Sequence, residues 1–278
     1  MRKLVPIIII VAAVAAGAYV GFVRARRKPA RVGPVLVASF LPADLGNAIV
    51  FETPEKRFVV IDPGPEQTAD ALVDYLRQAG VRSLDVIVTV PIDEHGGALG
   101  RLVDSFDVKR VIHGGPAWRK GLEGPKGPIG ELVLAAGDSI RLSPKVKVEV
   151  LSPPREPRGR LAEPLVTRIT FGKTRFLLAS DARMEDEAYL IRSGVDLAST
   201  VLVVPRHGRY GSTSLELLSL VRPEYCIVLV GEGADRPSRV VLDRIKTENT
   251  GAEVYRTDTG GPINIMTDGH SIQVGQEF

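Results

Sequence analysis

Histidine, cysteine and acidic side chains are the residue types with which this chain could bind a metal or move a proton. The sequence holds one cysteine, Cys226, and only four histidines, which are His95, His113, His207 and His270. His95 follows two acids in the stretch Thr89–Gly97, where a glycine pair predicts a tight turn. His207 lies between an arginine and a glycine directly after an apolar run.

The other candidates fit structural roles better. His113 follows an apolar run, so we expect a histidine in a loop or at a sheet edge. His270 stands in an Asp-Gly-His turn and should be solvated. Cys226 begins the apolar run Cys226–Val230, which predicts a buried thiol with no disulfide.

The elements that must position these residues alternate between short strands and helices. Helical patterns cover Gln67–Gln78, Ala98–Val103, Met184–Arg192, Ser214–Leu220 and Ser238–Thr247. Leu122–Gly130 is rich in glycine and proline and should be a loop. Strand patterns cover Val35–Phe40, Ala48–Glu52, Phe58–Ile61, Val86–Val90, Val108–Ile112, Val146–Leu151, Val166–Phe171, Arg175–Ala179, Val201–Val204, Cys226–Val230 and a β-rich tail from Val254. This order predicts an α/β domain with two sheets between helical layers.

Residues 4–23 form an apolar run without a charge, flanked by cations on both sides. As a helix they would span about 30 Å, the thickness of a bilayer core. A cleaved signal peptide is the alternative, but the length of the run and the cations after it favour an uncleaved transmembrane anchor. We therefore expect a short tail (1–3), an anchor (4–23), a basic juxtamembrane linker (24–34) and one domain (35–278).

The charge of the chain is divided unevenly. Residues 1–31 hold seven of the 36 cations and none of the 33 acids, so the remainder has a net charge near −4. Such a domain is a poor nucleic-acid binder, whereas the basic linker suits anionic lipid head groups. The positive-inside bias favours a cytoplasmic domain on a single-pass membrane protein, with the extracytoplasmic side left open.

Four stretches, in order along the chain, resemble the metallo-β-lactamase-like domain of the competence protein ComEC. They are Phe58–Pro65, which ends in an Asp-x-Gly pattern, Thr89–Gly97, Phe176–Ala182 and Val203–Gly208. The resemblance covers about residues 36–274. It implies the αββα sandwich of the metallo-β-lactamase fold and a two-metal hydrolytic site.

The motif of that family, His-x-His/Asp-x-Asp-His-Gly-Gly, is degenerate here. Its first position is Val90 and its third is Ile92, neither of which can bind a metal. The family also supplies a ligand, commonly a histidine, between this motif and the stretch that matches Phe176–Ala182, and this chain has no histidine between His113 and His207. The resemblance therefore implies that the first metal site is lost.

The resemblance leaves a candidate second site. The positions that match its ligands are Glu94, His95, Asp181 and His207. Two imidazoles and two carboxylates suit zinc best, and also manganese or iron. Glu94 stands where the family has aspartate and is one methylene longer, so we expect either one divalent metal at this site or none.

Arg206 occupies the other histidine position of the family's last motif. It could be a plain surface arginine. Alternatively, its guanidinium compensates for the lost metal charge beside Asp181, or steadies a developing oxyanion in an active enzyme.

Three functions remain open. The first is a non-catalytic or weakly active domain that binds or assembles with a protein partner at the membrane. The second is a single-metal hydrolase of phosphodiesters or esters. The third is a DNA-processing nuclease, which the negative domain and the lost ligands disfavour.

Overall fold

A computed structural model describes residues 33–90, 93–115, 123–124, 127–156, 163–179, 181–230, 237–248 and 251–276. The side chains of Asp93 and Glu94 are outside this description, as are the expected anchor and linker up to residue 32. No helix within the described ranges is long and apolar enough to cross a membrane. Residues 35–278 form one compact unit.

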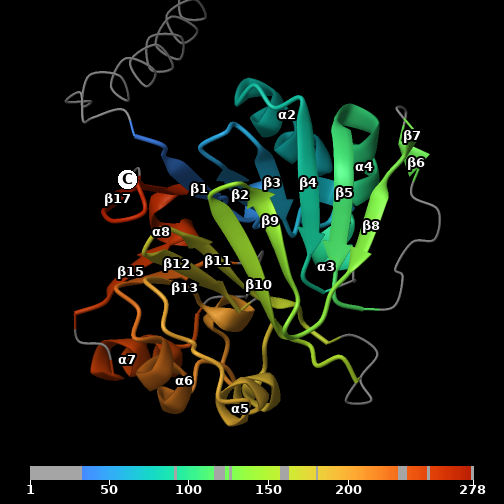
Figure 1. Cartoon of the computed structure of the whole chain (residues 1–278). Helices are drawn as coiled ribbons and strands as arrows, with labels where there is room; N and C mark the ends of the chain where they lie inside the picture. The colour runs from blue at the N-terminus through green and yellow to red at the C-terminus, as the bar shows by residue number, and fades with distance from the viewer. Residues whose placement is uncertain are drawn as a thin grey trace, which may run out of the picture. The chain divides into compact units, whose positions relative to one another are not determined.

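The first sheet has the strand order β17-β16-β1-β2-β3-β4-β5-β8 (Figure 1). The strands from β16 to β3 pair antiparallel, whereas β3, β4, β5 and β8 pair parallel. Their bounds are β1 Leu36–Phe40, β2 Ile49–Glu52, β3 Phe58–Ile61, β4 Ser83–Val88, β5 Asp107–His113, β8 Gly130–Val133, β16 Ile263–Thr267 and β17 Ile272–Gln276.

The second sheet has the order β15-β14-β13-β12-β11-β10-β9. The hairpin strands β9 to β12 pair antiparallel, and β12 to β15 pair parallel through helical connections. Their bounds are β9 Ser139–Ser143, β10 Val146–Ser152, β11 Val166–Phe171, β12 Thr174–Leu178, β13 Val201–Val203, β14 Tyr225–Val228 and β15 Glu253–Arg256.

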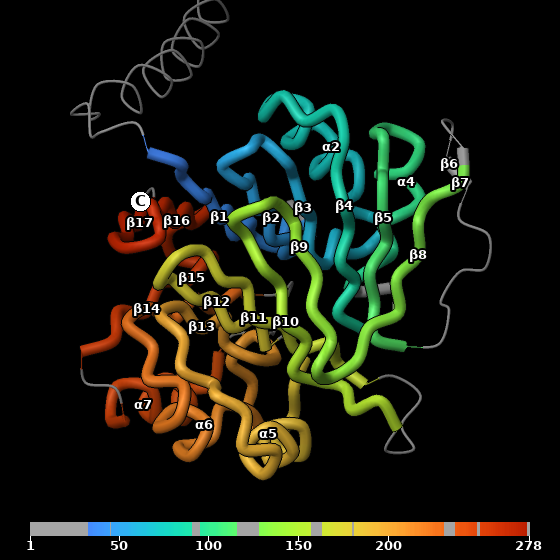
Figure 2. Tube along the Cα trace, in the orientation of Figure 1, coloured from blue at the N-terminus to red at the C-terminus, as the bar shows by residue number. Residues whose placement is uncertain are grey.

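Helices cover the outer face of each sheet (Figure 2). One apolar cluster fills the space between the sheets, where the rings of Phe51 and Phe176 meet edge to face with centroids 5.4 Å apart. A second cluster packs the first sheet against α2 and α4, and a third packs the second sheet against α5, α6 and α7. The helices are α2 Ala69–Gln78, α4 Leu99–Ser105, α5 Met184–Arg192, α6 Leu215–Val221 and α7 Arg239–Glu248.

These layers confirm the prediction of an αββα sandwich. Each buried leucine or phenylalanine contributes about 1.5 to 3 kcal/mol, so the three clusters together are the main source of stability. All their members lie between Leu36 and Val274. The segment from residue 33 onward therefore contains its complete core and should fold without the preceding residues.

The sequence misplaces some elements. β4 ends at Val88, so Thr89 and Val90 belong to the following loop rather than to the predicted strand. The predicted loop Leu122–Gly130 contains two short paired strands, β6 Glu123–Gly124 and β7 Gly127–Pro128. β8 and β9 are not predicted, because their polar residues mask the alternation that marks a strand.

Candidate functional site

The candidate residues lie just beyond the carboxyl ends of parallel strands in both sheets. β3 and β4 pair parallel in the first sheet, and β12 and β13 pair parallel in the second. Parallel strands end at the same edge of a sheet, so the loops that follow them meet there. Asp62 follows β3, Thr89 follows β4, Asp181 follows β12, and the turn η3 (Pro205–Gly208), which contains Arg206 and His207, follows β13.

His95 bridges the two sheets at this edge. It lies in the one-turn helix α3, Asp93–Gly96. Its Nδ1 is 3.0 Å from Oδ2 of Asp62, and its Nε2 is 3.6 Å from Oδ2 of Asp181. The side chains of His95, Asp62 and Asp181 are 12%, 16% and 34% exposed. A single imidazole thus stands between two carboxylates in a mostly enclosed place.

The electrostatics of this triad favour a protonated histidine. Burial disfavours the charged form of His95, but the charges and contacts of Asp62 and Asp181 prevail and raise its pKa to about 10. For Asp181, burial acts to raise the pKa, yet His95, His207 and Arg206 together hold it below its usual value. At neutral pH the triad is therefore an imidazolium between two carboxylates.

Asp62 also fixes the loop after β4. Its Oδ1 accepts from the amide of Thr89 at 2.7 Å, and its Oδ2 accepts from the Thr89 hydroxyl at 2.5 Å. Its own backbone has a φ of 49°, a left-handed conformation that costs a non-glycine residue about 1 kcal/mol or more. Asp62 thus bonds both a loop amide and a loop hydroxyl, and its contact with His95 gives it a second role at the site.

Two close glycines hold the backbone around His95. The amide of Gly64 donates to the carbonyl of His95 at 3.1 Å, and the carbonyl of Gly64 accepts from Ala98 at 2.9 Å. A Cβ on Gly64 would lie 2.5 Å from the carbonyl oxygen of Gly46, and its φ is 82°. Only glycine fits this contact, so the Asp-x-Gly pattern has a structural cause.

Apolar packing replaces a ligand at the first motif position. Val90 is 6% exposed and therefore contributes to the core rather than to a polar pocket. Ile92, at the third position, is outside the described residues.

The turn that contains Arg206 and His207 has a left-handed backbone at both residues, with φ values of 51° and 55°. Nδ1 of His207 lies 2.9 Å from the carbonyl oxygen of Leu229, so Nδ1 donates a hydrogen bond to that oxygen. Arg206 lowers the pKa of Asp181 through its charge, but its guanidinium forms no hydrogen bond or ion pair with another described residue. Its expected role as a replacement for metal charge stays a prediction.

A buried acid supports this turn from α5. Glu187 is 1% exposed and accepts from the amides of Thr213 and Ser214 at 2.5 and 2.8 Å. The Ser212 hydroxyl donates to the carbonyls of Pro205 and Arg209 at 3.1 and 2.9 Å. The loop behind His207 is therefore held by its own hydrogen bonds and by α5.

The described part of the site meets some requirements of a metal centre and not others. Two ligands of one tetrahedral zinc ion lie about 3.3 Å apart, near the 3.6 Å between His95 and Asp181. Second partners that orient each imidazole, Asp62 and the Leu229 carbonyl, are typical of metal sites. However, no group of three or more His, Cys, Asp or Glu residues within the described ranges could hold a metal, and the side chain of Glu94 is not among them. These residues alone do not complete a metal site.

The remaining histidines and the cysteine have structural environments. His113 is 3% exposed and bonds the carbonyl of Gly115 and the carboxylate of Glu131, at 3.1 and 2.8 Å. The expected loop or edge position is wrong, because the unpredicted strand β8 covers that side of β5. His270 is exposed as predicted. Cys226 is buried as predicted, and burial raises its pKa to about 12.

The sequence resembles one curated protein, ComE operon protein 3 of Bacillus subtilis. The two are 26% identical over 213 residues, which are 69% of this chain but only 26% of that protein. This chain thus spans about a quarter of the relative's length. No family model matches the chain.

Solved structures with a similar fold include a mutant of CmlA β-hydroxylase, with a TM-score of 0.57 and 11% identity over 85% of this chain and 54% of that chain. The metallo-β-lactamase fold protein YhfI of Bacillus subtilis has a TM-score of 0.55 and 12% identity, covering 87% of this chain and 100% of YhfI. A metallo hydrolase of Ignicoccus hospitalis has a TM-score of 0.55 and 14% identity, covering 83% and 98%. The layers, the strand-end site and these neighbours together show that the chain has the metallo-β-lactamase fold and resembles ComE operon protein 3 in sequence.

Proposed function

We propose that this protein is a membrane-anchored member of the fold that binds or assembles with a protein partner and has little or no hydrolytic activity. Residues 4–23 anchor it, and residues 35–278 form the binding domain. The fold alone does not establish hydrolytic activity, because proteins of one fold differ in the residues of their sites.

The observation that supports a non-catalytic role is the placement of His95 between Asp62 and Asp181. In a working two-metal site, metal ions balance the carboxylates and polarise the substrate. Here an imidazolium supplies the positive charge, with ring-to-carboxylate distances of 3.0 and 3.6 Å. Because a metal must displace the proton of a ligating histidine, the proton that Asp62 and Asp181 favour on His95 competes with a metal for that ring.

The sequence supports the same proposal at the first site. Val90 replaces a ligand with a buried apolar side chain. A buried valine offers no ligand for a metal and no polar group for a hydrated phosphodiester.

Metal content tests the proposal. The fragment 33–278 would be purified at pH 7 without chelators, beside the Asp181→Ala, His207→Ala double variant, and both would be measured by elemental analysis. We expect less than about 0.1 equivalents of zinc, manganese or iron in either protein. About one metal per chain in the wild type and none in the variant would overturn the proposal.

Membrane anchoring needs its own test, because it does not depend on the site. The full chain should stay with the membrane pellet after extraction at alkaline pH, whereas fragment 33–278 should be released. Release of an intact full chain would contradict an anchor, and a shortened N-terminus found by mass spectrometry would indicate a cleaved signal peptide instead.

A single-metal hydrolase is the second candidate, and two observations favour it. The separation of His95 and Asp181 suits two ligands of one ion, and Nε2 of His207 has no hydrogen-bond partner among the described residues. Glu94, His95, Asp181 and His207 would hold the ion, which polarises a phosphoryl or acyl oxygen when bound. Arg206 would then bind the developing negative charge of the substrate. Hydrolysis of a phosphodiester or ester that requires added metal, and is lost in Asp181→Ala, would support this candidate.

A further inference from the structure

A row of side chains crosses the outer face of the second sheet away from the candidate site. The register places Arg141 of β9 opposite Lys147 of β10, Lys147 opposite Thr170 of β11, and Thr170 opposite Arg175 of β12. Residues that pair directly across strands point to the same face. Strands lie about 4.8 Å apart, so three cations fall within about 15 Å along one line.

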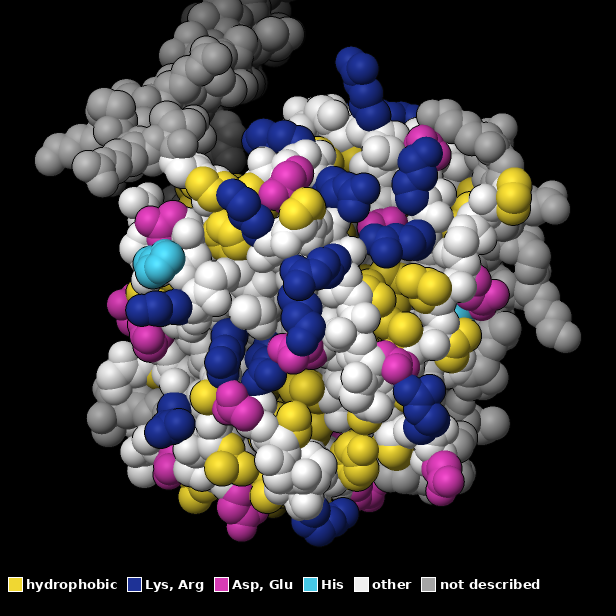
Figure 3. Space-filling view, viewed as in Figure 1, with side chains coloured by type: hydrophobic (Ala, Val, Ile, Leu, Met, Phe, Trp, Pro, Cys, Tyr) yellow, Lys and Arg dark blue, Asp and Glu magenta, His cyan; other side chains and the backbone are white. Residues whose placement is uncertain are grey.

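Two further cations extend this row at the β9–β10 turn. Nη1 of Arg57 donates to the carbonyl of Leu142 at 3.1 Å, and Nη1 of Arg141 donates to the carbonyl of Pro144 at 3.0 Å. Lys145 is exposed in the same turn. Figure 3 shows Lys and Arg side chains gathered along the middle of this face, over the region of β9 and β10. The cationic face is defined here by Arg57, Arg141, Lys145, Lys147, Arg168 and Arg175.

Few acids balance the cationic face. Glu149 pairs with Lys147 and Arg168, and Asp196 pairs with Arg175. Six cations against these two acids give a surplus of four positive charges. A surplus of this size on a domain with a net charge near −4 requires a strongly negative remainder. These six cations therefore outnumber the acids that pair with them, although other acidic side chains lie on the same face (Figure 3).

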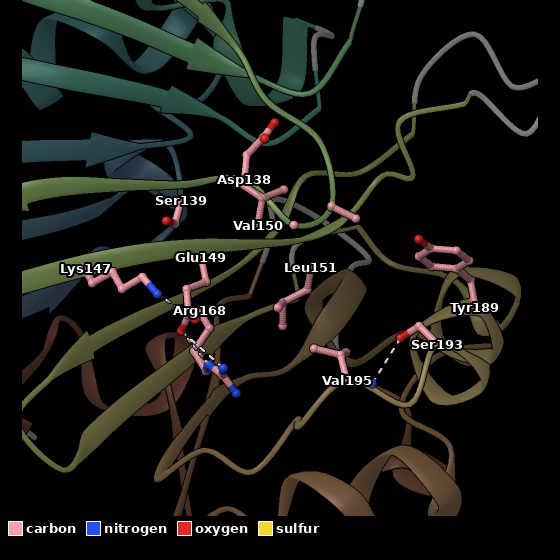
Figure 4. Close-up of a pocket in the computed structure, with 12 residues that line it drawn as sticks. Asp138, Ser139, Lys147, Glu149, Val150, Leu151, Arg168, Tyr189, Ser193 and Val195 are labelled. Atoms are coloured by element: carbon pink, nitrogen blue, oxygen red, sulfur yellow. Dashed lines mark hydrogen bonds and ion pairs between the residues drawn. The ribbon is translucent and has the colours of Figure 1, made fainter.

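The surplus lies at the exposed end of the face. A cleft of about 220 Å³ between β10 and α5 is lined by Lys147, Glu149 and Arg168. Figure 4 shows the charged ends of these three side chains directed toward one another, so the cleft itself is close to neutral. Arg57, Arg141 and Lys145 are exposed, and the guanidinium groups of Arg57 and Arg141 bond only backbone carbonyls within the described residues.

We propose that the cationic face docks on the anionic phospholipid surface of the membrane. This inference rests on the proposed function in one respect, because the proposed anchor is what holds the domain close to the bilayer. The 11 residues of the linker, 24–34, can span at most about 40 Å, which keeps every face of the domain near the bilayer. Basic side chains near such a surface each add to the attraction.

Lipid head groups fit this face better than a protein or a nucleic acid does. The exposed large apolar residues of the described chain, which include Met184, Tyr210 and Leu215, belong to other segments. A stable protein interface needs such residues at its centre. No described aromatic side chain belongs to the row, whereas bases of single strands bind by stacking on aromatic rings. The long basic side chains of the paired strands can each contact a separate lipid phosphate.

Sedimentation with vesicles tests the inference without the anchor, because fragment 33–278 contains its whole core. We expect it to sediment with phosphatidylglycerol–phosphatidylcholine vesicles and not with pure phosphatidylcholine. Binding should decrease by about tenfold or more in Arg141→Glu, Lys145→Glu. Vesicle binding should also decrease as the salt concentration rises from about 0.1 M to about 1 M, because salt screens exposed charges.

The matched control reverses two cations on α7, Arg239→Glu and Lys246→Glu, which changes the net charge equally. It should keep most of the vesicle binding, since the position of the charge matters and not its total. Equal loss in both variants, no binding by the folded wild type, or preference for a single-stranded oligonucleotide over the vesicles would each overturn the inference. None of these outcomes depends on metal content, so the proposed function is tested separately.

Discussion

The candidate site and the cationic face treat charge in opposite ways. At the site, His95 stands between Asp62 and Asp181 in a mostly enclosed place, and its charge is used within the protein. On the cationic face, Arg57, Arg141 and Lys145 are exposed without acid partners among the described residues. The charges of the site neutralise one another within the protein, whereas the exposed cations are available to attract anions from solution.

Enclosed and exposed charges should therefore contribute to different properties, the first to stability and the second to binding. Enclosed ion pairs are costly to break, because removal of one partner leaves a charge in a poor solvent. Exposed charges contribute little to stability and act mainly on association. Substitutions at the site should therefore change unfolding, and substitutions on the face should change binding.

The largest expected effect is at Asp62. The Asp62→Ala change removes the partner of His95 and both bonds to Thr89, so the free energy of unfolding should fall by about 3 kcal/mol. Asp70→Ala is the control, because Asp70 is 78% exposed and pairs only with Arg101 at the surface. Urea denaturation would measure both, and similar small losses would remove the contrast between enclosed and exposed charge.

Alkaline pH should weaken the same triad. The pKa of His95 is raised from 6.5 to about 10 in the folded chain. Its protonation therefore stabilises the fold fully below about pH 6.5, and this contribution is lost as the pH rises toward 10. We expect the metal-free wild type to lose about 2 to 3 kcal/mol more than His95→Gln between pH 7 and 10. Parallel stability curves for the two proteins would show that His95 is not protonated at neutral pH.

Substitution of Gly64 tests how much the close backbone packing around His95 contributes to the free energy of unfolding. Gly64→Ala combines a left-handed backbone with a contact of 2.5 Å to Gly46, and should cost about 2 kcal/mol or more. Gly80→Ala has a similar φ of 78° with nothing within 4 Å of the added carbon. It should cost only about 1 kcal/mol. Equal losses of melting temperature would mean that the loops separate to admit the methyl group.

The smallest effect on stability should come from the cationic face. Arg141→Glu, Lys145→Glu should leave the free energy of unfolding within about 0.5 kcal/mol of wild type. The same protein should lose vesicle binding. A large loss of stability would show that these cations hold the β9–β10 turn, and would change the meaning of the binding result.

The sequence predicts the apolar framework and the order of its motifs, and less of the site. Val86–Val88 and Cys226–Val228 are plain apolar strands and were expected. Ser139–Ser143 was not, because its serines and arginine hide the period of two. The contact of Asp62 with His95 joins residues 33 positions apart, and could be inferred only from the parallel pairing of β3 and β4. The left-handed backbone at Arg206 has no local signal, because arginine does not favour it, whereas histidine is among the types enriched there.

The carboxylate of Glu187 has a mechanical consequence. It ties the amides of Thr213 and Ser214 to α5, while α5 itself begins three residues after Asp181. The segments 181–192 and 205–214 should therefore open together, as one unit of local unfolding, and their amides should share one rate of hydrogen exchange. His95 follows a strand of the other sheet, so opening of this unit would separate Asp181 from His95.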